Sequence, residues 1–221
     1  MKISKFPNKI TEELAEETGW HIGDGSMNYY KNGKKMMGLY QLRGHIEDDK
    51  RHYIERIKPF FKRLYGIDIS LREMPSTRVF GFQIWNDKLV KFKQSLGLPL
   101  GKKFELEIPK QFLSDKELIV ACIRGIFDTD GCLYLEKKNG KLYPRIEIAT
   151  ISSLLGEQLN SLLLGLGLRS TVYTMKTYGN RIMPYKVSIR GEEMLHKFIQ
   201  IINPQNPKHL AKYNLFEQSF K

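Results

Sequence analysis

The sequence feature that most constrains the fold is an apolar helical segment that ends in aspartate and glycine and occurs twice. The second copy, residues 123–131, reads Ile-Arg-Gly-Ile-Phe-Asp-Thr-Asp-Gly, and the first, residues 17–25, reads Glu-Thr-Gly-Trp-His-Ile-Gly-Asp-Gly. Aligning Asp24 with Asp130 sets a shift of 106 residues and aligns a glycine five residues before each aspartate. Small residues let helix backbones approach closely. We therefore expect the two helices to cross with both aspartates at the same end.

The same shift relates other parts of the chain, because it aligns Phe92 with Phe198 and Lys102 with Lys208. Hydrophobic periodicity gives the same order of elements in both halves. The sequence therefore predicts an α+β fold, a duplicated α-β-β-α-β-β-α unit with pseudo-twofold symmetry, whose halves are residues 1–103 and 104–221. One expected helix ends at residue 23, and the others span 47–65, 87–96, 115–128, 153–165 and 191–202. The expected hairpins span 26–46, 67–85, 132–150 and 169–190.

Local signals place the ends of several of these elements. Ser114, with Glu117 three residues later, has the spacing of a capping box and is expected to start the second of the two repeated helices. Asn32-Gly33 and Asn139-Gly140 are expected hairpin turns. Pro59 is expected to kink or break the helix that contains it, because proline lacks the N–H that the helix ladder needs.

The two aspartates are the candidate functional residues. A carboxylate at a helix C-terminus lies beside carbonyl groups that carry partial negative charge, which is unfavourable unless a cation binds there. Carboxylate and carbonyl oxygens are the ligands that Mg²⁺ and Ca²⁺ take. The alternative is that Asp-Thr-Asp-Gly is only a polar turn. The second Asp-Gly, at Asp24, favours a shared metal site, because a divalent cation relieves the repulsion between two close carboxylates.

The charge of the chain indicates a nucleic-acid partner. Lys and Arg number 36 against 24 Asp and Glu, giving a net charge of +12, and the pI is near 9.5, so a polyanion is the expected ligand. Cys122 and Cys132 form no disulfide or zinc pattern and suit a reducing compartment. Since the sequence has no apolar run of membrane-spanning length and no signal peptide, an intracellular protein without a membrane partner is expected.

The basic residues are concentrated on the expected strands, and tyrosines lie among them. A charged surface is most often only a solvated face, but a two-stranded ribbon fits the major groove of duplex DNA, where basic and amide side chains read base edges. Which of the candidate residues read bases and which bind phosphates stays open. The candidate DNA-binding residues are Lys31, Lys34, Lys35, Arg43, Arg72, Arg78, Lys137, Lys138, Lys141, Arg145, Arg169, Lys176, Arg181, Lys186 and Arg190.

The segment 123–131 resembles the motif of the LAGLIDADG homing endonucleases, and 17–25 resembles a degenerate first copy. The first copy has Ile22 where the second has its earlier acid, Asp128; the later acid is the metal ligand in the family. The resemblance implies a monomeric, two-motif, intron-encoded member whose two sheets form a DNA-binding saddle. It also implies metal-dependent cleavage of both strands of a long, nearly palindromic site, across the minor groove and with 3′ overhangs.

In the implied site, Asp24 and Asp130 hold Mg²⁺ together with the backbone carbonyls of Gly23 and Thr129. Mn²⁺ is expected to substitute, and Ca²⁺ to bind without supporting cleavage. Lysines are implied beside the scissile phosphates, and the register proposes Lys102 and Lys208 as catalytic, with the adjacent Lys103 and His209 as alternatives. Two other functions stay open on the same scaffold: a maturase that binds intron RNA and a DNA-binding regulator that does not cleave.

Overall fold

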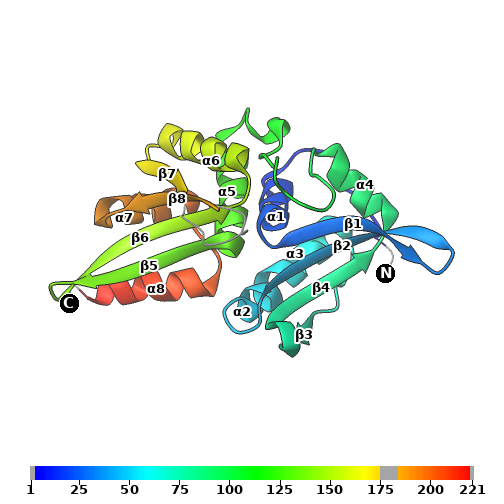
Figure 1. Ribbon diagram of the computed structural model, residues 1–221, viewed down its shortest axis with the longest axis horizontal. Helices are drawn as coiled ribbons and strands as arrows, with labels where there is room; N and C mark the ends of the chain where they lie inside the picture. The colour runs from blue at the N-terminus through cyan, green and yellow to red at the C-terminus, as the bar shows by residue number, and fades with distance from the viewer. Residues whose placement is uncertain (1–2, 175–183, 220–221) are drawn as a thin grey trace.

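The computed structural model describes residues 3–174 and 184–219 and has an α+β fold of two halves with the same topology (Figure 1). Each half has a four-stranded antiparallel sheet, ordered β1-β2-β4-β3 in the first and β5-β6-β8-β7 in the second. The predicted fold class is therefore confirmed. The first half contains α1 Glu12–Gly23, β1 Gly25–Asn32, β2 Lys35–His45, α2 Lys50–His52, α3 Lys58–Tyr65, β3 Arg72–Met74, β4 Val79–Trp85 and α4 Asp87–Ser95. The second contains α5 Lys116–Asp130, β5 Gly131–Lys138, β6 Lys141–Thr150, α6 Ser153–Gly165, β7 Ser170–Thr174, β8 Tyr185–Arg190, α7 Glu192–Ile202 and α8 Pro207–Gln218.

The helices α1 and α5 lie side by side at the centre of the molecule, and the sheets extend outward from them (Figure 1). Their backbones meet at Gly19 and Gly125: a Cβ atom on Gly19 would overlap the carbonyl oxygen of Cys122, and one on Gly125 would overlap that of Glu16. Glu16 and Cys122 are themselves 106 residues apart. The contact is thus reciprocal, as expected for a pseudo-twofold axis between the helices.

Each sheet has one face in the core and one polar face, because side chains alternate along a strand. On β2, Tyr40 and Leu42 are fully buried. Gln41, which lies between them, is half-buried, and Arg43, which follows them, is exposed. The same alternation on β6 buries the isoleucines at 146 and 148. The polar face of that sheet carries Arg145, Glu147, Lys186 and Ser188.

The interface between the halves also contains a buried charge. Glu16 on α1 is 3% exposed and accepts from Arg56 of the first half at 2.6 Å and from Arg124 of the second half at 3.1 Å. Arg124 also donates to the carbonyl oxygen of Ile202 at 2.8 Å. With two guanidinium partners the carboxylate is fully paired, which a buried charge requires. The arrangement therefore holds the crossing helices in one relative position.

Several element ends differ from the sequence-based expectation. The side chain of Asp115, not Ser114, caps α5 and accepts from the N–H groups of Glu117 and Leu118. The first hairpin turn is Gly33-Lys34 instead of Asn32-Gly33, because Asn32 pairs with Lys35 and Gly33 takes the positive φ of 62°. The turn Asn139-Gly140 is confirmed, with φ values of 50° and 77°. Before Pro59, the helix passes through a π-helical turn, Tyr53–Ile57.

The segment between α4 and α5 packs on the second half. Leu96, Leu98, Leu106, Ile108 and Phe112 are buried in the same hydrophobic cluster as the core of that half. The boundary at residue 103 stays a prediction. No helix in the described part of the chain is long and apolar enough to cross a membrane.

Candidate active site at the ends of the crossing helices

Asp24 and Asp130 lie at the C-terminal ends of α1 and α5, as the repeated motif predicts. Asp24 is the C-cap of α1, is half-buried, and accepts a hydrogen bond from the Tyr53 hydroxyl at 3.0 Å. Desolvation raises the pKa of Asp24 well above its usual value, and the charges of Asp130 and Asp49 raise it further. The two aspartates are thus close enough to repel each other, which is the condition that favours a bound cation.

Asp130 is the last residue of α5 and its side chain is open to solvent on one side. The surrounding protein nevertheless desolvates it enough to raise its pKa to about 6. The positive charges of Lys103 and Lys208 act in the opposite direction and lower this pKa, while Asp49 raises it. Three carboxylates and two lysines therefore share one electrostatic environment at the helix ends.

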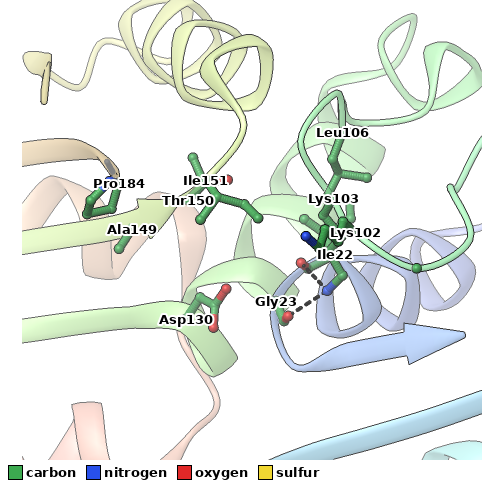
Figure 2. Close-up of a pocket in the computed structure, with 11 residues that line it drawn as sticks. Ile22, Gly23, Lys102, Lys103, Leu106, Asp130, Ala149, Thr150, Ile151 and Pro184 are labelled. Atoms are coloured by element: carbon green, nitrogen blue, oxygen red, sulfur yellow. Dashed lines mark hydrogen bonds between the residues drawn. The ribbon is translucent and has the colours of Figure 1, made fainter. Parts of the chain in front are cut away.

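Lys103 lies against the C-terminus of α1. Its Nζ donates to the carbonyl oxygens of His21, Ile22 and Gly23 at 2.8, 2.9 and 2.8 Å, and Figure 2 shows it over Gly23, with Asp130 nearby. The last carbonyls of a helix lack its regular backbone donors, and the helix dipole favours a cation there. Burial lowers the pKa of Lys103 to about 8, against the raising effect of the two aspartates.

Lys208 occupies the corresponding place at the end of α5. Its Nζ donates to Asp49 Oδ1 at 2.8 Å and to the carbonyl oxygen of Thr129 at 3.4 Å. Asp49, which is 4% exposed, also accepts from the side chain of Asn206 at 2.8 Å and from the N–H of His45 at 2.8 Å. The N-terminal half thus supplies the carboxylate that holds a lysine of the C-terminal half.

Asp128, the earlier acid of the second motif, anchors the chain that carries Lys208. It accepts from the backbone N–H of Gln205 at 2.9 and 3.0 Å and from that of Asn206 at 3.1 Å. Asn206 in turn caps α8 by accepting from the N–H of Lys208 at 3.1 Å. Burial raises the pKa of Asp128 to about 7. Its role in the structure is to position the start of α8.

Two pockets flank the aspartates and are related by the 106-residue shift. One, of about 380 Å³, is lined by Ile22, Gly23, Gly101, Lys102, Lys103, Leu106, Asp130, Ala149, Thr150, Ile151 and Pro184 and is named here the Asp130 pocket (Figure 2). The other, of about 650 Å³, is lined by Asp24, Arg43, Gly44, His45, Asp48, Asp49, Thr77, Arg78, Val79, Thr129 and Lys208 and is named the Asp24 pocket. Residues 23, 102, 130, 149, 150, 151 and 184 of the first correspond to 129, 208, 24, 43, 44, 45 and 78 of the second. Each pocket thus combines the aspartate of one half with the residue that precedes the aspartate of the other half: Asp130 with Gly23, and Asp24 with Thr129.

The predicted lysines lie in these pockets but differ in their contacts. Lys102 lines the Asp130 pocket, is exposed, and lies over the ring of Phe104 at 5.4 Å from the centroid. The neighbouring Lys103 reaches the carbonyl of Gly23, whereas in the other half it is Lys208 that reaches the equivalent carbonyl of Thr129. Relative to the 106-residue alignment, the lysine that contacts the helix-end carbonyl therefore lies one position later in the first half than in the second. The catalytic roles of Lys102 and Lys208 stay predictions.

Most of the predicted DNA-binding residues are exposed side chains of the hairpins and sheets. One group, in and beside the hairpin turns, comprises Lys31, Lys34, Lys35, Lys137, Lys138 and Lys141, and further exposed arginines are Arg43, Arg72, Arg78, Arg169 and Arg190. Lys176 and Arg181 lie outside the described residues.

Some of these basic residues are paired with acids. Arg145 contacts Glu136 at 2.5 Å, and Lys186 contacts Glu147 at 2.6 Å, while Arg169 pairs with Glu193 on α7 at 2.9 Å. Glu147 is buried on the polar face of the second sheet and also accepts from the Tyr173 hydroxyl at 2.7 Å. Acids thus fix the positions of basic side chains in the second half.

Sequence reasoning missed Asp49, Asn206 and Tyr53. Asn206 precedes Pro207, and Asn followed by Pro is a helix-start signal that was available in the sequence. Asp49 and Tyr53 carry no such signal, because their importance comes from a contact with residues far along the chain.

Comparisons with known proteins agree with this architecture. Residues 117–203 match the family model of a LAGLIDADG-like domain. Among curated proteins, the replicative DNA helicase DnaB of Rhodothermus marinus is 30% identical over 53% of this chain and 12% of that protein. The replication factor C small subunit of Methanocaldococcus jannaschii is 26% identical over 91% of this chain and 10% of that protein. The chain thus spans less than a fifth of the length of either relative.

Solved structures show the same fold. A complex of I-DmoI with DNA and Ca has a TM-score of 0.64 at 17% identity, covering 92% of this chain and 97% of that one. The LAGLIDADG meganuclease I-AabMI bound to uncleaved DNA has a TM-score of 0.55 at 14% identity, covering 90% of this chain and 87% of that one. Residues 117–203 thus match a LAGLIDADG-like domain, and the chain as a whole shares the fold of these solved structures.

Proposed function

We propose that the protein is a site-specific DNA endonuclease that makes a double-strand break in a long, nearly palindromic duplex and acts as a monomer. The observation that carries the proposal is the pair of equivalent pockets, each with an aspartate, a carbonyl of the other helix and a lysine. A related site for each strand, in one chain, is what cleavage of two antiparallel strands requires. The bound DNA and metals of the solved relatives support it.

The residues at the helix ends fit a divalent metal. Asp24 and Asp130 supply carboxylates, and Gly23 and Thr129 supply carbonyl oxygens, the oxygen ligands that Mg²⁺ prefers. Within the described residues no three His, Cys, Asp or Glu side chains are placed to hold a metal alone. Mg²⁺ commonly binds through one or two carboxylates and completes its shell with water and substrate phosphate. Bound there, it would lower the pKa of a water and stabilise the charge of the leaving oxygen.

The side chains around the aspartates have separate tasks in this proposal. Lys208 and Lys103 place positive charge beside the scissile phosphates, where the transition state gains negative charge. Tyr53 orients the carboxylate of Asp24 by donating to one of its oxygens, which leaves the other oxygen for a ligand. Asp49 and Asn206 hold Lys208 in place.

The polar faces of the two sheets are the proposed DNA-binding saddle. Strand ribbons fit the major groove, and Gln41, Gln83, Arg145 and Lys186 are side chains of the types that read base edges. The exposed lysines at the hairpin turns lie at the outer ends of the sheets (Figure 1), a position suited to phosphates.

Selection of cleaved products from a randomised duplex library, with Mg²⁺ or Mn²⁺, tests the proposal. We expect the native protein to enrich one sequence, and to bind but not cleave it in Ca²⁺. In this proposal Asp24 and Asp130 share or adjoin one central metal, so the variants Asp24→Asn and Asp130→Asn should each cleave neither strand. They should still bind, because an amide keeps the shape of the side chain and loses the charge that holds the metal.

Asp68→Asn is the matched control, since Asp68 is an exposed carboxylate paired with Lys58, away from the helix ends. It should cleave as the native protein does. Undiminished cleavage by either Asp24→Asn or Asp130→Asn would reject the metal site, and a library from which nothing is enriched would reject the endonuclease function.

A further inference from the structure

The Asp24 pocket and the Asp130 pocket are equivalent in position but unequal in lining. We propose that the protein cleaves the DNA strand bound in the Asp24 pocket faster than the strand bound in the Asp130 pocket, because Arg43 and His45 complete only the former. The inference rests on the proposed endonuclease function and adds an order to its two cuts.

The inequality lies at the end of the second strand of each sheet. In the Asp24 pocket the strand β2 contributes Arg43 and His45. The residues 106 positions later are Ala149, near the end of β6, and Ile151, just after it, and both line the Asp130 pocket. An arginine and a histidine in one pocket therefore have alanine and isoleucine as their counterparts in the other.

His45 is positioned for chemistry by its neighbours. Its side chain is 35% exposed, and its Nδ1 lies 3.2 Å from Asp48 Oδ2 and accepts from the N–H of Asp48 at 3.4 Å. These contacts orient the ring and leave Nε2 for a water or a phosphate oxygen. An oriented imidazole can transfer a proton or hold the attacking water, whereas the side chain of Ile151 can do neither.

Arg43 adds a second difference. Its backbone N–H donates to the carbonyl oxygen of Asp24 at 3.3 Å, so the residue is fixed beside the aspartate, and its side chain is exposed. A guanidinium makes paired, charge-assisted hydrogen bonds to phosphate. Ala149 offers no group for this contact.

The lysines of the two pockets are also held differently. The buried carboxylate of Asp49 fixes Lys208, and the residue 106 positions after Asp49 is Leu155, which is 2% exposed. Lys102, the counterpart of Lys208, is exposed over an aromatic ring. A group already held in place loses less freedom on reaching the transition state. Lys103 brings positive charge to the Asp130 pocket, but no histidine or arginine comes with it among the described lining residues.

The test uses a synthetic duplex of the sequence enriched by the selection, with a different fluorophore on each strand. The native protein should nick one strand faster than the other. The double variant Arg43→Ala/His45→Ile gives the Asp24 pocket the lining of the other pocket. It should slow the faster strand by about 10²-fold, the contribution of one positioned proton-transfer group, and leave the slower strand unchanged.

The reciprocal variant Ala149→Arg/Ile151→His tests the same point without removing a native group, and it should speed the slower strand. Lys208→Met identifies the strand in the Asp24 pocket, which must be the strand that Arg43→Ala/His45→Ile slows. DNA affinity in Ca²⁺ shows that each variant is folded.

Equal nicking of the two strands by the native protein would overturn the inference while leaving the endonuclease function in place. Equal slowing of both strands by Arg43→Ala/His45→Ile, or slowing of the strand that Lys208→Met spares, would also overturn it. A library from which nothing is enriched rejects the endonuclease function and the inference together.

Discussion

At the scale of single residues, His21, His52 and His209 are buried and held neutral. Burial lowers the pKa of each, and that of His52 falls to about 3 with a further contribution from the charge of Arg56. Unfolded histidines bind protons below a pH of about 6.5. The unfolded chain therefore takes up more protons than the folded chain as the pH falls from about 6.5 toward 3, and this lowers the free energy of unfolding.

We expect His52→Leu to remove the proton that residue 52 binds in the unfolded chain but not in the folded chain as the pH falls. Relative to the native protein, the fall of the free energy of unfolding between pH 6 and 4 should become shallower by up to about 1.4 kcal/mol per pH unit. Buried carboxylates such as Asp128, with its pKa raised to about 7, act in the opposite sense, and the comparison with the native protein at each pH cancels them. Urea unfolding at a series of pH values measures the difference. Identical slopes for the two proteins would contradict it.

At this scale the sequence predicted the placement of Asp24 and Asp130 at the ends of α1 and α5, because the signal is local: an acid at a helix end, repeated in register. It did not predict which lysine reaches which carbonyl. The register aligns Lys102 with Lys208, yet Lys208 is in the first turn of a capped helix and Lys103 is in a loop outside the helices and strands. Backbone conformation, which differs between these segments, decides where the ammonium goes.

At the scale of elements, the crossing of α1 and α5 depends on two glycines. A Cβ atom on Gly19 or Gly125 would overlap a backbone carbonyl of the facing helix, which cannot move aside as a side chain can. We expect Gly19→Ala and Gly125→Ala each to destabilise the fold by about 1–3 kcal/mol or more, the typical cost of overpacking. Separating the helices should also impair cleavage, because both aspartates lie at their ends.

Gly165→Ala is the matched control, since Gly165 is the last residue of α6 and a Cβ atom there meets open space. It should be neutral or stabilise by up to about 1 kcal/mol, because alanine has the higher helix propensity. Thermal unfolding of the three variants makes the comparison. If Gly19→Ala unfolded at the same temperature as Gly165→Ala, the helices would not pack through this glycine.

Helices and hairpins were predictable as elements because their hydrophobic periodicity is regular, but their ends were less so. Ser114 and Asp115 are both good caps, and it is Asp115 that has the extended backbone of an N-cap and accepts from the N–H groups of Glu117 and Leu118. In the first hairpin, pairing of Asn32 with Lys35 moves Gly33 to the first turn position, where a positive φ suits a type II′ turn. Strand register, which depends on the partner strand, settles such choices.

At the scale of the whole molecule, the net charge of +12 predicts salt-dependent DNA binding. Neutralised phosphates release counterions, so the logarithm of the affinity should fall linearly with the logarithm of the salt concentration. Lys31→Ala and Lys137→Ala, on exposed positions of β1 and β5, should each reduce the slope by about 1. Fluorescence anisotropy with a labelled duplex in Ca²⁺ measures it.

Lys62→Ala is the matched control, because Lys62 is exposed on α3, the helix that packs on the opposite face of the first sheet. It should leave the slope as it is. A slope near zero for the native protein, or an equal change from Lys62→Ala, would contradict a DNA-binding surface on the polar faces.

The duplication was the part of the whole fold that the sequence predicted best, because segments related by a constant shift of 106 residues form the same elements in the same order and topology. The differences between the halves were not predictable in the same way. Asp49 corresponds to Leu155, and nothing in the chain near Asp49 indicates that it contacts Asn206 and Lys208.

The reciprocal glycine contact has the geometry of an isologous interface, in which the same patch serves both partners. In a dimer of identical chains, one codon change would appear at both sites and keep them alike. Here a covalent connection, residues 96–115, joins the two sides. A change at residue 45 therefore alters one site and leaves residue 151 as it is. For the proposed endonuclease, the covalent connection would allow a DNA target whose two halves differ in sequence.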